Sequence, residues 1–282
     1  MYNNTKRTKD NNSLPLRPFT PKVESKNSKG ENMPTSFILN KAVRLGRNHG
    51  IVSKNCQDAI GVFDGEQNGN RLLYGIICDG CSEGASSEVG ANLAKNFLVR
   101  EIFDQLEKGT SLYDLPEILY WNLIANLRSV VDNIRFRTPA DRIDFIKNNL
   151  LFTVVGFVVT PKETLIFITG DGLYIANDLI VHVDANDEAL YPGYHLVDRS
   201  ALLAPPTTVL PTNFDYEVYQ TPLLFRIAIG SDAWKQEQEL LYQIWGLGRK
   251  DKSELQRKIN RWSDKEHRFK DDVSLITVEM EV

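Results

Sequence analysis

The spacing of hydrophobic residues along the chain changes twice, from a strand-like period to a helical one and back. Before residue 80 these residues form short runs, and the runs at Ile60–Phe63 and Arg71–Cys78 predict two strands joined by the turn residues Asn68-Gly69-Asn70. Between residues 88 and 149 they recur at helical spacing, which is typical of amphipathic helices. Beyond residue 150, short β-branched and aromatic runs indicate strands again.

Three helices are predicted in the middle block. The first has two apolar rows, formed by Val89, Leu93 and Phe97 and by Leu98, Ile102 and Leu106. The second begins near Asp114 and Pro116, because Asp is a favourable N-cap and Pro is tolerated in a first turn. A third, shorter helix begins at Thr138-Pro139 for the same reason.

The last part of the chain predicts six strands and two helical segments. The strands are expected at Phe152–Thr160, Thr164–Thr169, Leu173–Ala176, Leu179–Val183, Leu224–Gly230 and Val273–Glu279. The helical segments are expected near Gln236–Trp245 and Ser253–Trp262, and the proline-rich stretch Asp184–Pro222 is expected to be irregular. Strands on both sides of two helical blocks favour an α+β fold with antiparallel sheets.

The first 34 residues have a different composition from the rest. They are rich in Asn, Lys, Ser and Pro, carry a net charge of +4 and contain few large apolar residues. Such a segment buries too little apolar surface to offset its ordering entropy. We therefore expect a disordered polar tail over residues 1–34 and one folded domain over residues 35–282, with docking to an acidic partner as an alternative role for the tail.

Composition excludes several classes of protein. The 282 residues are 42% hydrophobic and 25% charged, with a net charge of −4, so neither nucleic-acid binding nor a polybasic membrane anchor is expected. No run approaches the roughly 18 apolar residues of a membrane span. The N-terminus lacks the apolar core of a secretory signal, and three cysteines are too few for a disulfide framework. We therefore expect a cytoplasmic protein.

Acidic residues stand at four places where a predicted strand meets a loop. Asp79, Asp171 and Asp232 each come after an apolar strand, and Asp271-Asp272 precedes the last one. Strand ends that meet at one edge of a sheet would bring these carboxylates together, and they would repel one another unless cations were bound. Such oxygen-rich clusters select Mg²⁺ or Mn²⁺. The alternative for each Asp is that it caps a turn.

Five motifs in a fixed order carry a resemblance to a known family. They are Asn55-Cys56-Gln57-Asp58-Ala59, Ile76-Ile77-Cys78-Asp79-Gly80, Thr169-Gly170-Asp171-Gly172, Ala228-Ile229-Gly230-Ser231-Asp232-Ala233-Trp234 and Asp271-Asp272-Val273-Ser274. Together they resemble the metal-dependent protein phosphatases of the 2C type, and the chain is similar to a divergent, bacterial-like member from about Phe37 to Val282.

The resemblance implies a sandwich of two antiparallel β-sheets flanked by helix pairs, with two Mn²⁺ or Mg²⁺ ions at one end. By position, Asp79 would bridge both ions and the Gly80 carbonyl would bind one of them. Asp232 and Asp271 would bind the other ion, and Asp171 matches a position that helps to hold a third ion in some members.

The same resemblance implies hydrolysis of phosphoserine or phosphothreonine in a phosphoprotein or phosphopeptide. A water between the two ions would attack phosphorus directly, without a covalent intermediate. Asp58 would hold metal-bound waters.

Several positions depart from the family pattern. Cys81 stands where many members have a His that protonates the leaving group, and Gln57 removes one carboxylate of an acidic pair. Ser53 stands where many members have a phosphate-binding Arg, which leaves Lys54 as the nearest candidate, with Arg44 and Arg47 as alternatives. Asp272 replaces an Asn.

Two other functions stay open. A phosphoprotein-binding module of the same fold, without turnover, would explain the changes at Ser53, Gln57 and Cys81. A zinc or redox protein would use Cys78 and Cys81, which form a Cys-x-x-Cys pair, with Cys56 as a further ligand. The four histidines show no metal-ligand spacing, and Trp234 is expected to pack beneath the site.

Overall fold

The computed structural model describes residues 36–184, 190–197, 209–249 and 251–281. The predicted tail over residues 1–34 lies outside these ranges, as do two parts of the expected irregular stretch, so both stay predictions there. All described residues belong to one compact unit of the chain. No helix in the described ranges is both long enough and apolar enough to cross a membrane.

The described residues form two five-stranded antiparallel sheets. One has the order β2-β3-β4-β5-β8, with bounds Asp58–Gln67, Asn70–Gly80, Phe152–Val159, Glu163–Thr169 and Asp215–Gln220. The other has the order β1-β10-β9-β6-β7, with bounds Ser36–Arg44, Val273–Glu281, Arg226–Gly230, Gly172–Ala176 and Leu179–Val183. The predicted α+β fold with antiparallel sheets is confirmed.

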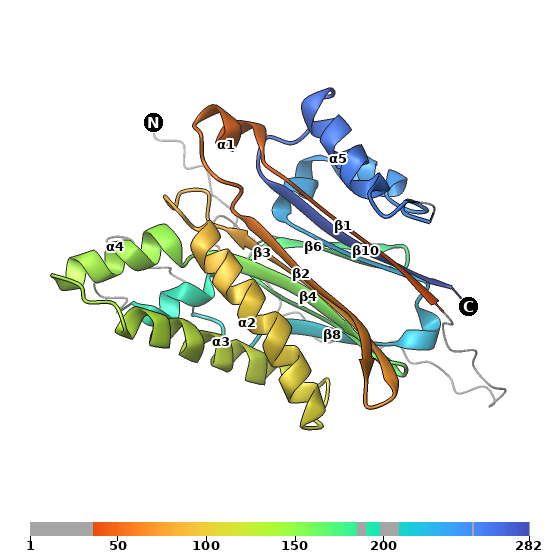
Figure 1. The fold of residues 1–282 in the computed structure, drawn as a ribbon, viewed down its shortest axis with the longest axis horizontal. Coiled ribbons are helices and arrows are strands. Elements are labelled where there is room, and N and C mark those ends of the chain that lie inside the picture. The colour runs from red at the N-terminus through yellow and green to blue at the C-terminus, as the bar shows by residue number, and fades with distance from the viewer. Residues whose placement is uncertain (1–35, 185–189, 198–208, 250, 282) are drawn as a thin grey trace, which may run out of the picture. The chain divides into compact units, whose positions relative to one another are not determined.

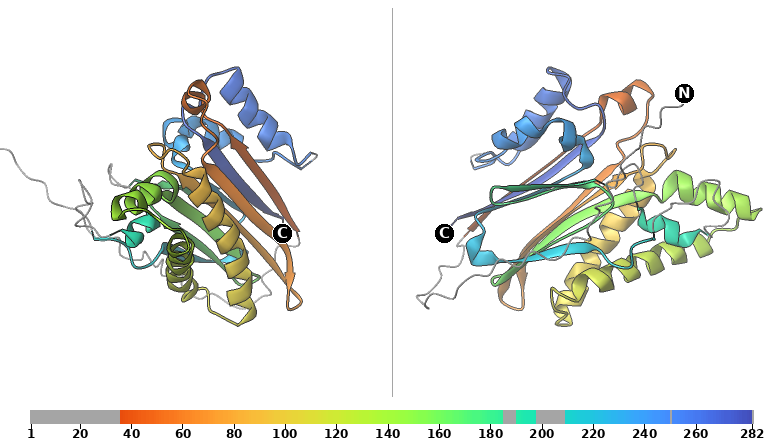
Figure 2. Two further views of the ribbon diagram at one scale, coloured as in Figure 1. Left: turned by 60° about the vertical axis from the view of Figure 1, so that its left-hand side comes forward. Right: turned by 180° about the vertical axis from the view of Figure 1, so that it is seen from behind.

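Helices cover the outer faces of the two sheets (Figure 1). The α-helices are α1 (Arg47–Ile51), α2 (Glu88–Glu107), α3 (Leu115–Asp132), α4 (Pro139–Asn149) and α5 (Glu254–Asp264). Short 3₁₀ helices are η1 (Pro192–Leu196), η3 (Thr221–Leu223), η4 (Asp232–Gln236) and η5 (Gln238–Gln243). Figure 2 shows α2, α3 and α4 on the side of one sheet and α5 on the side of the other.

Three apolar clusters fill the layers of this arrangement. The cluster between the sheets joins residues of both, such as Ile77 and Phe157 from one sheet and Ile229 and Ile276 from the other. A second cluster lies between α2, α3 and the β2–β3–β4 face, and a third lies beneath α5. Because strands are buried on both faces, β4 carries eight buried residues in succession, which explains its continuous apolar run.

The hairpin between β2 and β3 turns as its sequence predicts. Gln67 pairs with Asn70, which leaves Asn68 and Gly69 as a two-residue loop. Both have positive φ, at 53° and 75°, as a type I′ turn requires. The helix start predicted at Thr138-Pro139 is also confirmed: the Thr138 hydroxyl accepts from the backbone N–H of Asp141, and the Asp141 carboxylate accepts from the backbone N–H of Thr138, which completes a capping box.

Two local features differ in detail from the predictions. The helical segment expected near Gln236–Trp245 is the 3₁₀ helix η5 rather than an α-helix, and the 3₁₀ helix η4 comes directly before it. Trp234 in η4 and Leu240 and Leu241 in η5 are buried. Asp114 stands at the N-cap position of α3, yet its carboxylate accepts from Ser111 instead of capping the helix.

Two strands and one short helix were missed. Strand β8 lies inside the stretch expected to be irregular, and strand β1 precedes the first strand predicted. Each is the outermost strand of its sheet at one edge and pairs with a single neighbour, so its apolar pattern is weak. Helix α1 has only five residues, too few to show a helical period.

Candidate metal and active site

Two carboxylates face each other inside the first sheet. Asp58 begins β2 and Asp79 lies next to last in β3, and the antiparallel register places them directly opposite one another. Asp79 is also paired with Thr153 on β4. The hydrogen-bonded ladder therefore fixes both backbones, and the Asp58 side chain is buried.

Three further carboxylates come from strand ends of the second sheet. Leu173 on β6 pairs with Gly230 on β9, so Asp171 and Asp232 lie just beyond the paired residues of neighbouring strands. Gly170 has a φ of 82°, which favours glycine and turns the chain sharply before Asp171. Asp271 lies just before β10, which pairs with β9.

The electrostatics place these carboxylates within reach of one another. Burial raises the pKa of Asp79 well above its usual value, and the charges of Asp58, Asp232 and Asp171 raise it further. Burial also raises the pKa of Asp232 to about 6, with added repulsion from Asp171 and Asp271. The two sheets thus bring the predicted residues into one acidic cluster.

The donor set of this cluster fits divalent cations. Burial raises the pKa of Asp58 to about 7. Neither carboxylate oxygen of Asp58 has a hydrogen-bond partner among the described residues, although both atoms are inaccessible to solvent. Buried carboxylates without partners are costly, and the repulsion between them is relieved by bound Mg²⁺ or Mn²⁺.

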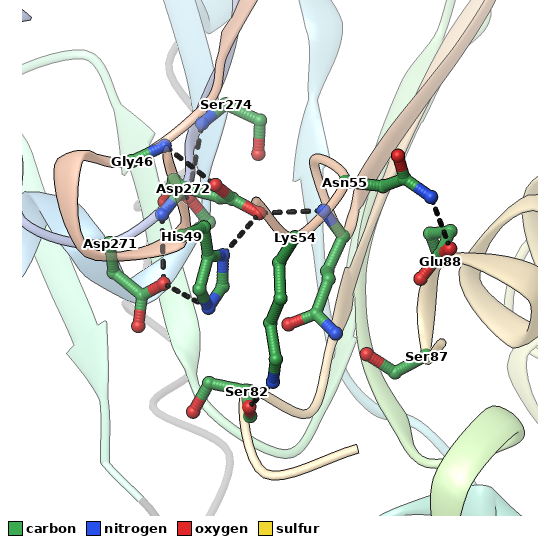
Figure 3. Close-up of polar contacts among 12 residues, drawn as sticks. Gly46, His49, Lys54, Asn55, Ser82, Ser87, Glu88, Asp271, Asp272 and Ser274 are labelled. Carbon is green, nitrogen blue, oxygen red and sulfur yellow. Dashed lines mark hydrogen bonds and ion pairs between the residues drawn. The ribbon is translucent and has the colours of Figure 1, made fainter. Parts of the chain in front are cut away.

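A histidine lies between the two aspartates before β10 (Figure 3). His49 Nδ1 lies 2.9 Å from Asp272 Oδ2, and His49 Nε2 lies 3.5 Å from Asp271 Oδ1. Among the described residues, ligand atoms from three His, Cys, Asp or Glu side chains come within 4.8 Å of one another only in this trio. The atoms of Asp79, Asp232 and Asp271 are not gathered that closely.

Asp272 has a structural part in this arrangement. Its buried carboxylate accepts from the backbone N–H of Gly46 at 2.6 Å and from that of Gln57 at 2.6 Å. Gly46 lies so close to this segment that a Cβ would be 2.2 Å from the Asp271 carbonyl carbon. Asp272 therefore ties the chain before α1 and the chain before β2 to the start of β10, and an Asn could accept at one of its two side-chain atoms only.

Sequence reasoning did not identify His49 as part of the site. It lies in a five-residue helix, and its partners are more than two hundred positions away. The only signal was the polar stretch Asn48-His49-Gly50 before the Asp58 motif, which does not specify a partner. The four histidines show no metal-ligand spacing along the chain, and His49 reaches the two aspartates only through the fold.

Lys54 holds a loop. Its ammonium donates to the carbonyl of Ser82 at 2.6 Å and to that of Gly84 at 3.1 Å, as Figure 3 shows for Ser82. The Gln57 side-chain amide donates to the same Gly84 carbonyl at 3.1 Å, which a carboxylate could not do. Both departures from the family pattern thus secure the segment that follows Gly80.

The other basic candidates differ in their surroundings. Arg44 forms an ion pair with Asp264 at 2.6 Å, on the side of α5. Arg47 is exposed on α1.

The cysteines do not form a ligand cluster in the described part of the chain. All three are free, and burial strongly raises the pKa of the Cys78 and Cys56 thiols. A thiol held in its neutral form is a poor zinc ligand and a poor nucleophile. No cysteine belongs to the one group of converging ligand atoms.

Trp234 packs beneath the site, as expected. It is fully buried, its indole N–H donates to the Ser274 carbonyl at 3.0 Å, and its ring contacts Trp262 and Phe269. The tryptophan fixes the turn directly after Asp232.

Comparison with known proteins gives a consistent result. The family model described as protein phosphatase 2C matches residues 45–189, about half of the chain. No curated protein sequence matches.

Solved structures match over most of the chain. A bacterial serine phosphatase has a TM-score of 0.59 at 15% identity, covering 87% of this chain and 98% of that one. The serine/threonine phosphatase Stp1 from Staphylococcus aureus has a TM-score of 0.56 at 14% identity, covering 92% and 100%. The catalytic domain of the phosphatase PstP, solved with two manganese ions, has a TM-score of 0.50 at 13% identity, covering 88% and 100%. At these identities the similarity shows the fold.

Proposed function

Because the chain belongs to the protein phosphatase 2C family, we propose that it is a metal-dependent hydrolase of phosphoserine or phosphothreonine in proteins. The observation that carries this proposal is the cluster of carboxylates at the ends of both sheets, with raised pKa values and with the buried, unpartnered oxygens of Asp58 on the strand opposite Asp79. Such a cluster is costly unless cations bind it.

We assign the residues as follows. Asp79 and the Gly80 carbonyl would hold one Mn²⁺ or Mg²⁺ ion, and Asp232 and Asp271, together with Asp79, would hold the other. When bound, such ions supply a water of lowered pKa and stabilise charge on the phosphoryl oxygens. Asp58 lies opposite Asp79 and has free acceptor capacity, so it orients water beside the ions. PstP, solved with two manganese ions, supports a two-ion centre.

Lys54 positions the loop that follows Gly80. Its ammonium secures the carbonyls of Ser82 and Gly84, and this contact orients the loop that begins at Gly80. The prediction that Lys54 binds the substrate phosphate would require it to leave these carbonyls. Arg47, exposed at the same end as His49, is the alternative for that role. The substrate is a phosphoprotein or phosphopeptide, and a cytoplasmic location stays a prediction.

The test is hydrolysis of p-nitrophenyl phosphate and of a phosphothreonine peptide by the full chain. We expect activity with Mn²⁺ or Mg²⁺, none with EDTA, and loss in Asp79→Asn. Thermal unfolding of the variant checks that it is folded. Equal turnover by the wild type and by a folded Asp79→Asn variant would rule out the proposal.

A second candidate is a binding module that recognises phosphoproteins without turnover. The observation that favours it is the engagement of Lys54 with two backbone carbonyls, next to Ser53 in place of an arginine. Tight Mn²⁺-dependent binding of a phosphopeptide, measured by calorimetry, together with no release of phosphate would support this function instead.

A further inference from the structure

Three carboxylates lie side by side across neighbouring strand ends of the second sheet. Gly172 on β6 pairs with Val183 on β7, so Asp171 and Asp184 are the next residues on either side of that pair. Continuing the register between β6 and β9 from Leu173 and Gly230 places Asp171 opposite Asp232. The order across the edge is thus Asp184, Asp171, Asp232.

A fixed cation lies on this row. Lys235 is in η4, which begins at Asp232 and packs against β6. Its ammonium forms an ion pair with the carboxylate of Asp184, at the far end of the row from Asp232. Lys235 thus lies three residues after Asp232 in the chain and pairs with the carboxylate at the opposite end of the row.

The charge of Lys235 acts on the whole row. Burial raises the pKa of Asp171 and the neighbouring Asp184 raises it further, whereas Lys235 lowers it. For Asp232, burial raises the pKa and Lys235 lowers it. For His182 on β7, burial lowers the pKa and Lys235 lowers it further. By contrast, the largest influences on the pKa of Asp58 and of Asp79 are burial and neighbouring Asp and Ser side chains.

We propose that the Lys235 ammonium is a built-in counter-ion for Asp171 and Asp184, which occupies the place where these carboxylates would otherwise hold a divalent cation. The proposal rests on the proposed function and refines the prediction that Asp171 binds metal. An isolated exposed ion pair contributes little, but an ammonium shared by several carboxylates is held more firmly and repels an incoming cation. The consequence is a centre that binds two metal ions, with the Lys235 ammonium in the place of a third cation.

The experiment is Mn²⁺ titration of the full chain by calorimetry, with bound metal counted after equilibrium dialysis. We compare the wild type with Lys235→Gln, Lys235→Arg and the double variant Lys235→Gln/Asp171→Asn. Lys162→Gln, an exposed lysine at the β4–β5 turn, is the matched control. We expect two Mn²⁺ in the wild type and in Lys235→Arg, a third in Lys235→Gln, and its loss in the double variant.

Three results would overturn the proposal: a third, Asp171-dependent Mn²⁺ already present in the wild type, unchanged binding in a folded Lys235→Gln variant, or a raised KM for substrate in that variant without any change in metal number. The last result would make Lys235 a phosphate contact. Failure of the proposed function is distinguishable, because it would appear as no Mn²⁺ bound through Asp79. The site gained in Lys235→Gln depends on Asp171 and would still decide the role of Lys235.

Discussion

The two sheets supply carboxylates to the same site, but these carboxylates differ in backbone position and in the basic side chains beside them. The β2–β3 hairpin supplies Asp58 and Asp79 from within a hydrogen-bonded ladder, where burial is the largest influence on the pKa of each. The second sheet supplies Asp171, Asp232 and Asp271 from loops beyond its strands. There Lys235 and His49 lie close by.

This difference separates two kinds of acidic residue. The ladder carboxylates Asp58 and Asp79 repel each other, and bound metal ions would relieve that repulsion. We therefore assign their main role to metal binding. Among the loop carboxylates, Asp171 and Asp184 have the ammonium of Lys235 as a counter-charge, so removal of Asp171 should change the number or strength of bound ions rather than the existence of the centre.

The largest expected effect is a difference in activity between variants of a ladder carboxylate and of a loop carboxylate. Asp79→Asn should lower kcat/KM by about 10³-fold or more, because it removes a ligand that no other group replaces. Asp171→Asn should cost about tenfold or less, since Lys235 already balances that carboxylate. Steady-state kinetics at saturating Mn²⁺ would check this. Equal losses in the two folded variants would contradict the division between ladder and loop carboxylates.

The next effect is on stability and follows from the raised pKa of Asp58. Its pKa is about 7 in the folded chain against 3.8 unfolded, so the folded state binds the proton more tightly. The contribution of Asp58 to the free energy of unfolding of the metal-free protein should therefore be greatest below pH 4. It should fall as the pH rises toward 7, by up to about 4 kcal/mol.

Urea unfolding in EDTA at pH 5 and pH 7 measures this loss. Asp58→Asn should flatten the dependence, and Mn²⁺ added at pH 7 should restore the stability of the wild type. A wild type that gains stability between pH 5 and pH 7 without metal, in parallel with the variant, would show that Asp58 is ionised in the folded chain.

The same division explains what the sequence could predict. Asp79, Asp171 and Asp232 follow strands whose apolar runs are local and strong, and each run appears in the structure as β3, β5 and β9. Strand β7 was predicted with its observed bounds, because turn residues flank it. Where the position of a residue depends on its own strand, the pattern of apolar residues along the sequence is sufficient to predict that position.

Other features depend on contacts distant in sequence. His49 meets Asp271 and Asp272 only because β1 pairs with β10, the first strand with the last. Lys54 could be predicted near the site, but its bonds to Ser82 and Gly84 arise from the path of a loop. Edge strands β1 and β8 likewise take their conformation from one neighbour, so propensity alone did not reveal them.

A smaller effect is expected on the loop side of the site. His49→Ala removes the ring that lies between Asp271 and Asp272, so Asp271 should lose its orientation and Mn²⁺ affinity should fall by about 10–100-fold. Calorimetry with Mn²⁺ measures the change, and His267→Asn is the control, because His267 is exposed and its φ of 55° is one that asparagine tolerates. Unchanged affinity in a folded His49→Ala variant would mean that backbone contacts alone position Asp271.

The smallest effect should come from Cys81→Ser, which tests the zinc and redox alternative. The backbone of Cys81 is fixed independently of its thiol, because its N–H donates to the Leu151 carbonyl at 2.9 Å and its carbonyl accepts from Ser87 Oγ at 2.9 Å. Serine preserves the volume and hydrogen-bonding capacity, so stability should change by no more than about 0.5 kcal/mol. Mn²⁺-dependent activity should be retained, and metal analysis of the purified wild type should show no zinc. Stoichiometric zinc that disappears in Cys81→Ser would instead make the thiols ligands, in spite of the burial that keeps Cys78 protonated.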